Sequence, residues 1–328
     1  MNSTRVLQSM LDAAGPQATR IERLWWLMFW VTTVVYVAVI AWAIVAFMRG
    51  RRHAEAMPAR SRLRVAVEQE SDRAMLTAVA AAIGGTVVIL LGLLVASVLT
   101  NRAVASLGAS SAVTINLIGH QWWWEAEYES ATPSERFKTA NELHIPVGRP
   151  VVLKVTSRDV IHSVWIPNLQ GKRDLIPGYT TAIWLQADRA GLFRGQCAEF
   201  CGAEHARMAL YVIAEPNEDF EKWRAGQIKS AVEPSTDEAR LGRDVFVHST
   251  CTQCHTIRGT IAGATVGPDL THLASRGTIA AGTMPNRRGH LAGWIADPQR
   301  IKPGVRMPPN SVQSEDLQRL LTYLETLK

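Results

Sequence analysis

Two long uncharged stretches dominate the first third of the chain. Residues 24–48 and residues 74–99 contain no charged side chain. At roughly 1.5 Å per residue the first stretch would form about 37 Å of helix, enough to cross a bilayer with some tilt. A core helix of a soluble protein does not need this length. The pattern therefore predicts a membrane protein with a two-helix transmembrane hairpin over residues 21–100.

The loop between the two spans, residues 49–73, contains seven arginines and four acidic residues. Short loops rich in arginine stay in the cytoplasm, so residues 1–20 and everything after residue 100 are expected on the outer side. Asp12, Gly15 and Pro16 interrupt the apolar run that a cleavable signal peptide needs. We therefore expect a multi-pass protein of the bacterial plasma membrane, surrounded by lipid, with its larger domains on the periplasmic side.

After the hairpin, short β-type runs alternate with clusters of turn residues such as Pro146-Val147-Gly148 and Ile176-Pro177-Gly178-Tyr179. Many short strands at fairly regular spacing predict a small antiparallel sandwich or barrel over residues 110–216. The expected strands are Val113–Ile118, His144–Ile145, Val151–Val155, Ser163–Ile166, Thr181–Gln186 and Leu210–Ala214.

The last part of the chain has helical patterns and glycine-rich loops. Residues 217–237 are predicted to be a helix followed by a linker, and residues 238–328 a separate helical domain. Its final helix is expected to begin at Ser314, with Glu315 and Asp316 in the first turn, where the helix dipole favours acidic groups.

Composition changes this picture little. The 328 residues are long enough for several domains, and the formal net charge of +6 belongs partly to the arginine-rich loop. The chain has no lysine- or arginine-rich recognition helix, so nucleic acid is not an expected partner.

Two of the four cysteines lie in a motif rich in metal ligands. Cys197 and Cys201 are followed by His205 and Met208 at ligand spacing. Soft sulfur ligands together with imidazole favour copper over magnesium or calcium. A second histidine, His162, lies at the end of a predicted strand, and two thiolates could bridge two copper ions. The alternative is a disulfide between the two cysteines, which is common outside the cell.

The other two cysteines lie in Cys251-Thr252-Gln253-Cys254-His255, the attachment sequence of a covalent haem c. Cys251 and Cys254 would form the thioethers, and His255 would bind the iron on one side. A zinc site would need further cysteines or histidines at short spacing, which the chain does not offer.

The second axial ligand of the iron is expected to be a methionine in an irregular loop before the last helix. Met307 is followed by Pro308 and Pro309 and stands just before that helix, so it is preferred. Met284, also followed by a proline, is the competing residue.

On these motifs, residues 112–215 resemble the CuA cupredoxin domain of cytochrome c oxidase subunit II. The spacing Cys-x-Glu-x-Cys-x3-His-x2-Met and the segment Asp159-Val160-Ile161-His162-Ser163 carry the resemblance. It implies a cupredoxin-like Greek-key barrel. The haem motif and its flanks, Gly242-x3-Phe246 before it and Gly267-Pro268-Asp269-Leu270 after it, resemble an all-α class I cytochrome c domain. It implies a binuclear CuA centre and, at the Glu199 side chain, a magnesium ion at the contact with subunit I. The implied copper ligands are His162, Cys197, Cys201, His205, Met208 and the carbonyl of Glu199.

Three consecutive tryptophans, Trp122 to Trp124, resemble the aromatic patch of the same family. The first of them is the residue through which that family admits electrons to copper, so Trp122 is assigned this role. Trp123 and Trp124 are expected to be structural. The alternative is that all three only pack the barrel.

The resemblance implies an electron-transfer subunit of a terminal oxidase. Electrons would pass from haem c to CuA and then to the haem–copper subunit I, where oxygen is reduced to water and protons are translocated. This chain would hold no oxygen site. The implied partners are subunits I and III, and either cytochrome c or a quinol-oxidising complex as the donor.

Two other functions remain open at this point. Residues 70–90 lack the tryptophan and proline of the family's second span, which leaves room for a nitric oxide reductase with a CuA subunit. A membrane-tethered copper-binding or thiol-redox protein is the alternative from a different class.

Overall fold

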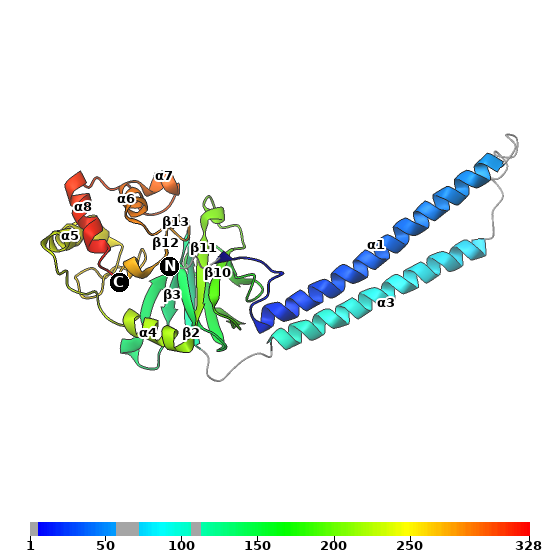
Figure 1. The fold of residues 1–328 in the computed structure, drawn as a ribbon, viewed down its shortest axis with the longest axis horizontal. Helices are drawn as coiled ribbons and strands as arrows, with labels where there is room; N and C mark the ends of the chain where they lie inside the picture. Colours follow the sequence, from blue (N-terminus) through cyan, green and yellow to red (C-terminus); the bar gives the residue numbers. More distant parts are fainter. Residues whose placement is uncertain (1–5, 57–71, 106–112) are drawn as a thin grey trace. The chain divides into compact units, whose positions relative to one another are not determined.

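The computed structural model describes residues 6–56, 72–105 and 113–328. Residues 57–71 of the predicted cytoplasmic loop, among them Arg60, Arg62 and Arg64, lie outside the described residues. The chain divides into two compact units, one of residues 20–106 and one that combines residues 1–19 with residues 107–328 (Figure 1).

The first unit is a pair of long helices, α1 (Pro16–Ala56) and α3 (Asp72–Ala105). Both are long and apolar enough to cross a membrane, over Pro16–Arg52 and Met75–Ala105. Their large side chains, such as Trp42, are exposed in the protein alone, as expected of residues that face lipid. The guanidinium of Arg20 on α1 donates to the carbonyl of Ala103 on α3 and joins the two helices.

The second unit contains a β-domain, residues 113–215, built from two sheets (Figure 1). One sheet has the order β4-β3-β2-β6-β9, and the other has the order β5-β11-β10-β7-β8 with β1 beside β10. The strands of the first sheet are β2 (Val113–His120), β3 (Trp123–Tyr128), β4 (Phe137–Ala140), β6 (Val151–Ser157) and β9 (Thr181–Leu185). Those of the second sheet are β1 (Val6–Leu7), β5 (Glu142–Pro146), β7 (His162–Trp165), β8 (Arg173–Leu175), β10 (Gly191–Cys197) and β11 (Ala209–Glu215).

Both sheets are mixed, so the predicted purely antiparallel pairing was wrong. Strand β2 runs parallel to β6, and β5 runs parallel to β11. Each of these pairs is joined by a long connection that contains other strands, and such a connection lets two partners enter a sheet in the same direction. A run of short strands in the sequence does not reveal this connectivity.

Strand β3 was not predicted, because it carries Glu125 and Glu127. Glu125 is nevertheless buried, with its carboxylate 2.6 Å from Nζ of Lys138 and 3.4 Å from Nε2 of His120. Burial alone would raise the pKa of Glu125, but these two partners hold it below its ordinary value. The paired carboxylate can therefore lie inside the domain at a tolerable cost.

The N-terminal segment is part of the β-domain. Strand β1 pairs with β10. The backbone N–H of Ala14 donates to Asn168 over 2.7 Å, and Asp188 donates to the carbonyl of Ala14 over 2.7 Å. At Gly15 a Cβ atom would lie 2.0 Å from the carbonyl oxygen of Gln186, so only glycine allows this approach.

The C-terminal helical domain, residues 238–328, packs around Phe246, Leu320 and Tyr323. The side chain of Thr236 accepts from the backbone N–H of Ala239 and caps its first helix. The helices are α4 (Asn217–Gln227), which precedes the domain, then α5 (Asp237–His248), α6 (Arg288–Ala296), α7 (Pro298–Ile301) and α8 (Ser314–Leu324). The short elements of this domain are η3 (Thr250–Gln253), η4 (Leu273–Ser275), β12 (Thr278–Ile279) and β13 (Met284–Pro285), while η1 (Pro133–Glu135) and η2 (His205–Arg207) belong to the β-domain.

The connection between the two domains is tied to the helical domain. The guanidinium of Arg258 donates to the carbonyl of Ile228 over 3.0 Å, and Ala231 donates its backbone N–H to the carbonyl of Arg258 over 2.9 Å. Nε2 of His272 lies 3.1 Å from the carbonyl oxygen of Lys229. The segment after α4 is thus held in place rather than left as a free tether.

Gly242 allows α5 and α8 to cross at close range. A Cβ atom there would lie 2.0 Å from the carbonyl oxygen of Arg319 and 2.9 Å from Cβ of Tyr323. Since the backbone of α8 cannot move without separating the helices, Gly242→Ala is expected to destabilise the domain by about 1–3 kcal/mol. Thermal unfolding of the haem-loaded protein, followed by haem absorbance, would show a lower midpoint.

Gly289→Ala on α6 is the matched control, because nothing lies within 4 Å of its Cβ position. Its midpoint should stay close to that of the parent protein. Equal midpoints for the two variants would contradict the close crossing of α5 and α8.

Candidate copper and haem sites

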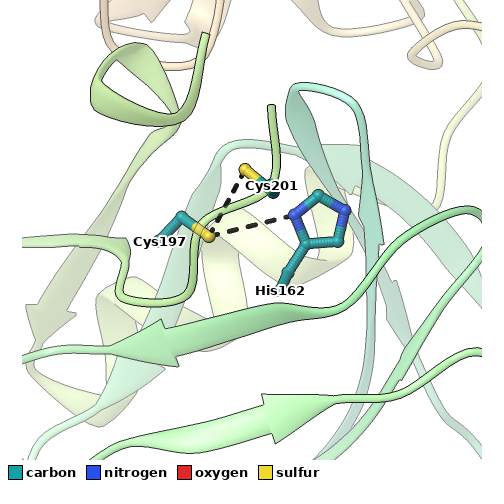
Figure 2. A group of neighbouring side chains, drawn as sticks. All are labelled: His162, Cys197 and Cys201. Carbon is teal, nitrogen blue, oxygen red and sulfur yellow. Dashed lines mark hydrogen bonds between the residues drawn. The ribbon is translucent and has the colours of Figure 1, made fainter. Parts of the chain in front are cut away.

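Three buried side chains meet at one end of the β-domain. His162 is the first residue of β7, Cys197 is the last residue of β10, and Cys201 lies in the following loop. Their ligand atoms all lie within 4.8 Å of one another. Figure 2 shows both sulfur atoms and the imidazole ring of His162 directed toward a common point.

The separations in this cluster match those of ligands that share a metal ion. Sγ of Cys197 lies 3.8 Å from Nδ1 of His162 and 3.7 Å from Sγ of Cys201. Sγ of Cys201 lies 3.6 Å from Nδ1 of His205 and 3.9 Å from Sδ of Met208. Two ligand atoms bound at roughly 2.0–2.3 Å to one tetrahedral ion are about 3.6 Å apart. The cluster therefore has the spacing and the donor atoms of a site for a soft metal ion such as copper.

The alternative of a disulfide is not what the structure shows. Cys197 and Cys201 are both free. Their sulfur atoms are 3.7 Å apart, far beyond the bond length of about 2.05 Å in a disulfide. The carbonyl oxygen of Glu199 lies 3.1 Å from Sγ of Cys197, while the Glu199 side chain is exposed.

The protonation chemistry of the two thiols also suits a bound cation. Hydrogen bonding from Cys201, together with His162, holds the pKa of Cys197 well below its usual value. The neighbouring Cys197 thiolate and burial raise the pKa of Cys201. One proton leaves the pair readily, whereas loss of the second places two negative charges side by side. A metal cation compensates for that second charge, so the donor set fits copper.

Asp159 orients the first histidine. Its carboxylate lies 2.9 Å from Nε2 of His162 and accepts backbone N–H groups of Gln121 and Val160, each over 2.8 Å. Burial alone would raise the pKa of Asp159, but these hydrogen bonds lower it to about 2. The carboxylate therefore stays charged and directs Nδ1 of His162 toward the sulfur atoms. The role of Asp159 was not predicted from the sequence, although its position three residues before His162 is a usable signal.

Of the three tryptophans, Trp122 contacts the copper loop. Its indole N–H donates to the carbonyl of Cys201 over 2.9 Å, and the side chain of Gln121 donates to the same oxygen over 2.8 Å. Trp123 instead stacks on His120, with ring centroids 4.3 Å apart. Trp124 is fully buried in the core of the β-domain. This arrangement distinguishes Trp122 from its two neighbours.

A cavity in the second unit is lined by Cys251, Cys254 and His255. Nδ1 of His255 lies 2.7 Å from the carbonyl oxygen of Pro268, so Nδ1 donates there and Nε2 is left as the ligand. At Gly267 a Cβ atom would lie 2.7 Å from Cε1 of His255, and glycine therefore lets the ring lie flat against the backbone. Burial lowers the pKa of His255, which keeps the ring neutral as a ligand must be.

The two candidate methionines differ in their surroundings. Met307 lines the cavity together with His255. Met284 is in β13 and packs against the core of the helical domain. The structure thus favours Met307 as the second axial ligand.

Arg276 also lines the cavity, and burial lowers the pKa of its guanidinium. Its Nε atom has no hydrogen-bond partner among the described residues. A haem carries two carboxylates on one edge, and such a group would satisfy this donor. The lining therefore fits a haem. Arg276 was not predicted from the sequence, because nothing in its local sequence distinguishes it from a surface arginine.

Residues of the β-domain complete the same cavity. The aromatic side chains of Trp122 and Trp123 line it, as do His120, Gln121 and Asn141. Trp122 therefore borders the haem cavity and also donates a hydrogen bond to the copper loop.

Comparison with known proteins gives a family for each of the two domains that hold these clusters. Residues 113–215 match the family described as cytochrome c oxidase subunit II, periplasmic domain, and residues 239–328 match cytochrome c. A solved periplasmic domain of subunit II from Bradyrhizobium japonicum is 29% identical and superimposes with a TM-score of 0.34, over 36% of this chain and 95% of that one.

Two curated relatives show the same likeness, and the chain spans less than two thirds of the first one's length. Cytochrome c oxidase subunit 2 of Alkalihalophilus pseudofirmus is 40% identical over 217 residues, which are 66% of this chain and 61% of that protein. The subunit 2 of a Bacillus species is 30% identical over 262 residues, which are 74% of this chain and 72% of that protein. This chain thus belongs to the cytochrome c oxidase subunit II family, in a form that carries a C-terminal cytochrome c domain.

Proposed function

We propose that this chain carries electrons from a covalent haem c to a binuclear CuA centre in a terminal respiratory oxidase. One observation carries the proposal: Trp122 lines the haem cavity and its indole N–H donates to the carbonyl of Cys201. A single aromatic side chain thus borders both sites, which supports its role as the residue that admits electrons to copper.

The residues of the chain hold and shield the two groups. Cys197, Cys201 and Met208 are each at most 3% exposed, so water is kept from the copper ligands. A rigid β-scaffold limits the movement of these ligands when the charge changes. When bound, the copper pair and the haem supply two one-electron redox centres. The copper ligands are His162, Cys197, Glu199 through its carbonyl, Cys201, His205 and Met208. The haem would be attached to Cys251 and Cys254, and His255 and Met307 would supply ligands to its iron.

Electrons leave this chain for the haem–copper subunit I, where oxygen is reduced to water and protons are translocated. Membership of the subunit II family supports this assignment. A further subunit III completes the complex, and either a cytochrome c or a quinol-oxidising complex supplies electrons to the haem. The exposed carboxylate of Glu199 supports a magnesium site at the contact with subunit I.

The packing of the N-terminal segment supports the membrane topology. Strand β1 pairs with β10, so residues 6 and 7 belong to the same packed body as the β-domain. A packed body of this kind lies entirely on one side of a membrane. The chain between β1 and the rest of the β-domain must therefore cross the membrane an even number of times. In this arrangement residues 1–20, 110–216, 217–237 and 238–328 are periplasmic, residues 21–100 form the hairpin in the bacterial plasma membrane, and residues 49–73 are cytoplasmic.

The proposal can be tested on the purified native complex. After a brief light-driven reduction of haem c, the absorbance of the copper centre should show the electron arriving there before it reaches subunit I. Trp122→Phe removes the indole N–H that bonds to the carbonyl of Cys201. The substitution should slow the arrival of the electron by roughly 10-fold or more, because a displacement of about an ångström at a reacting centre has effects of this size. Trp123→Phe is the matched control and should transfer at close to the parent rate.

Consumption of oxygen by the same complex identifies the final acceptor. A complex that consumed nitric oxide instead would be the nitric oxide reductase of the first alternative. A chain that held copper but passed no electron between its sites would be the tethered copper-binding protein and would contradict the proposal.

A further inference from the structure

Lys302 is a buried lysine that none of the preceding roles uses. It follows α7 and is 1% exposed, although it lies in a loop next to Pro303 and Gly304. We propose that Lys302 is a positioning residue, which fixes the helical domain on the β-domain so that electrons pass directly between their two sites. This inference rests on the function proposed above.

The ammonium group joins the two domains through three carbonyl oxygens. Nζ of Lys302 donates to Trp122 over 2.7 Å and to Arg207 over 2.8 Å, both in the β-domain. It also lies 3.3 Å from the carbonyl oxygen of Ala280 in its own domain. An ammonium group has three donors, and these three oxygens match them.

Both β-domain partners of Lys302 belong to the copper site. Trp122 contacts the carbonyl of Cys201 through its indole. Arg207 is adjacent in sequence to Met208, whose Sδ lies 3.9 Å from Sγ of Cys201. A displacement of Lys302 would therefore act on the two segments that surround the copper loop.

On the other side, Lys302 begins the loop that carries the proposed axial ligand. A Cβ atom at Gly304 would lie 3.4 Å from the indole ring of Trp122, so this residue packs directly on the ring. Val305 packs against the core of the β-domain. Two residues later Met307 lines the haem cavity. The short segment from Lys302 to Met307 thus runs from the copper site to the haem site.

A lysine is a costly choice at this place if packing were its only role. Burial lowers the pKa of Lys302 to about 7, against the opposing effect of the Glu204 carboxylate. A methionine would fill a similar volume without this cost. What a methionine lacks is three donors directed at defined oxygens, and these donors fix a single relative position of the two domains.

Other hydrogen bonds also join the β-domain to the helical domain, and they allow the docking of the two domains to be measured without reference to Lys302. The carboxylate of Glu142 in β5 accepts the backbone N–H groups of Gly277 and Thr278, over 3.1 and 2.8 Å. The backbone N–H of Ala209 donates to the carbonyl of Ala281 over 3.1 Å. Hydrogen exchange of the Ala209 amide therefore reports whether the two domains are docked.

The test compares Lys302→Met with the parent protein in the intact oxidase. Electron transfer from haem c to copper should slow by roughly 10- to 100-fold, because the two sites lose their fixed relative position. The Ala209 amide should exchange faster. The absorption spectra of both centres should stay unchanged, since no ligand is altered. Lys302→Arg, which keeps a cationic donor, should restore part of the rate.

The control is Lys222→Met on α4, where the same chemical change affects a side chain that is 74% exposed. If Lys302→Met failed to assemble, Glu142→Gln would loosen the same boundary from the other domain and should also slow the transfer. Parent-like transfer in Lys302→Met, or a slower rate accompanied by an altered copper spectrum, would overturn the inference. Absence of transfer in the parent protein would instead overturn the proposed function.

Discussion

Cys197→Ser is expected to abolish the binuclear copper centre. Its Sγ lies 3.7 Å from Sγ of Cys201 and 3.8 Å from Nδ1 of His162, so it is the atom that links the cluster. With one thiolate left, two copper ions can no longer be bridged symmetrically. The electron paramagnetic resonance spectrum should change from the hyperfine pattern of two equivalent copper nuclei to that of one nucleus, or copper should be lost.

Oxygen consumption by the Cys197→Ser complex should fall by roughly 100-fold or more. Mutation of a residue that only hydrogen-bonds to a metal ligand already lowers metal affinity or activity by about 10- to 100-fold, and Cys197 is itself a proposed ligand. The haem spectrum of the same sample is the internal control, because Cys251 and Cys254, the proposed attachment residues, line a cavity in the other domain. A Cys197→Ser protein that kept the pattern of two copper nuclei would refute the assignment.

Met307→Leu is expected to have the second large effect, on the haem. Leucine fills a similar volume in the cavity but offers no sulfur to the iron. A methionine ligand raises the haem potential, so its removal should lower the midpoint by on the order of 100 mV or more. The lower potential would make the haem a stronger reductant, while the spectrum would lose the weak far-red band of sulfur-ligated ferric haem. Redox titration and absorption spectroscopy measure both effects.

Met284→Leu is the matched control for this change. Met284 is partly buried and packs against the core of the helical domain, so the substitution should leave the potential and the far-red band in place. The reverse result, a shift for Met284→Leu and none for Met307→Leu, would exchange the roles of the two methionines.

The chemistry of both sites could be predicted because their cysteine ligands are close together in the sequence. Cys197, Cys201, His205 and Met208 lie within a dozen residues, and the haem attachment residues are contiguous. Ligands that are this close in the sequence are also close in space, whatever the tertiary structure. The set of donor atoms could therefore be predicted without the structure.

The residues that support these ligands could not be predicted in the same way. Asp159, Arg276 and Lys302 are polar side chains whose importance comes from burial, and burial depends on segments distant in sequence. Lys302 bonds to Trp122, 180 residues earlier in the chain. The parallel pairing of β2 with β6 was missed for the same reason, because it depends on the path of the chain rather than on local pattern.

The placement of Trp122 against the haem cavity has a kinetic consequence. A separate carrier must find the copper domain by diffusion, and its rate of encounter depends on its concentration and on ionic strength. Here the donor is part of the same polypeptide and is held at the contact by buried hydrogen bonds, including those of Lys302. Delivery of the electron becomes a first-order event at a fixed effective concentration. Residues on the surface of the helical domain then determine which external reductant binds. Substitutions on that surface can alter this specificity without any change to the copper loop.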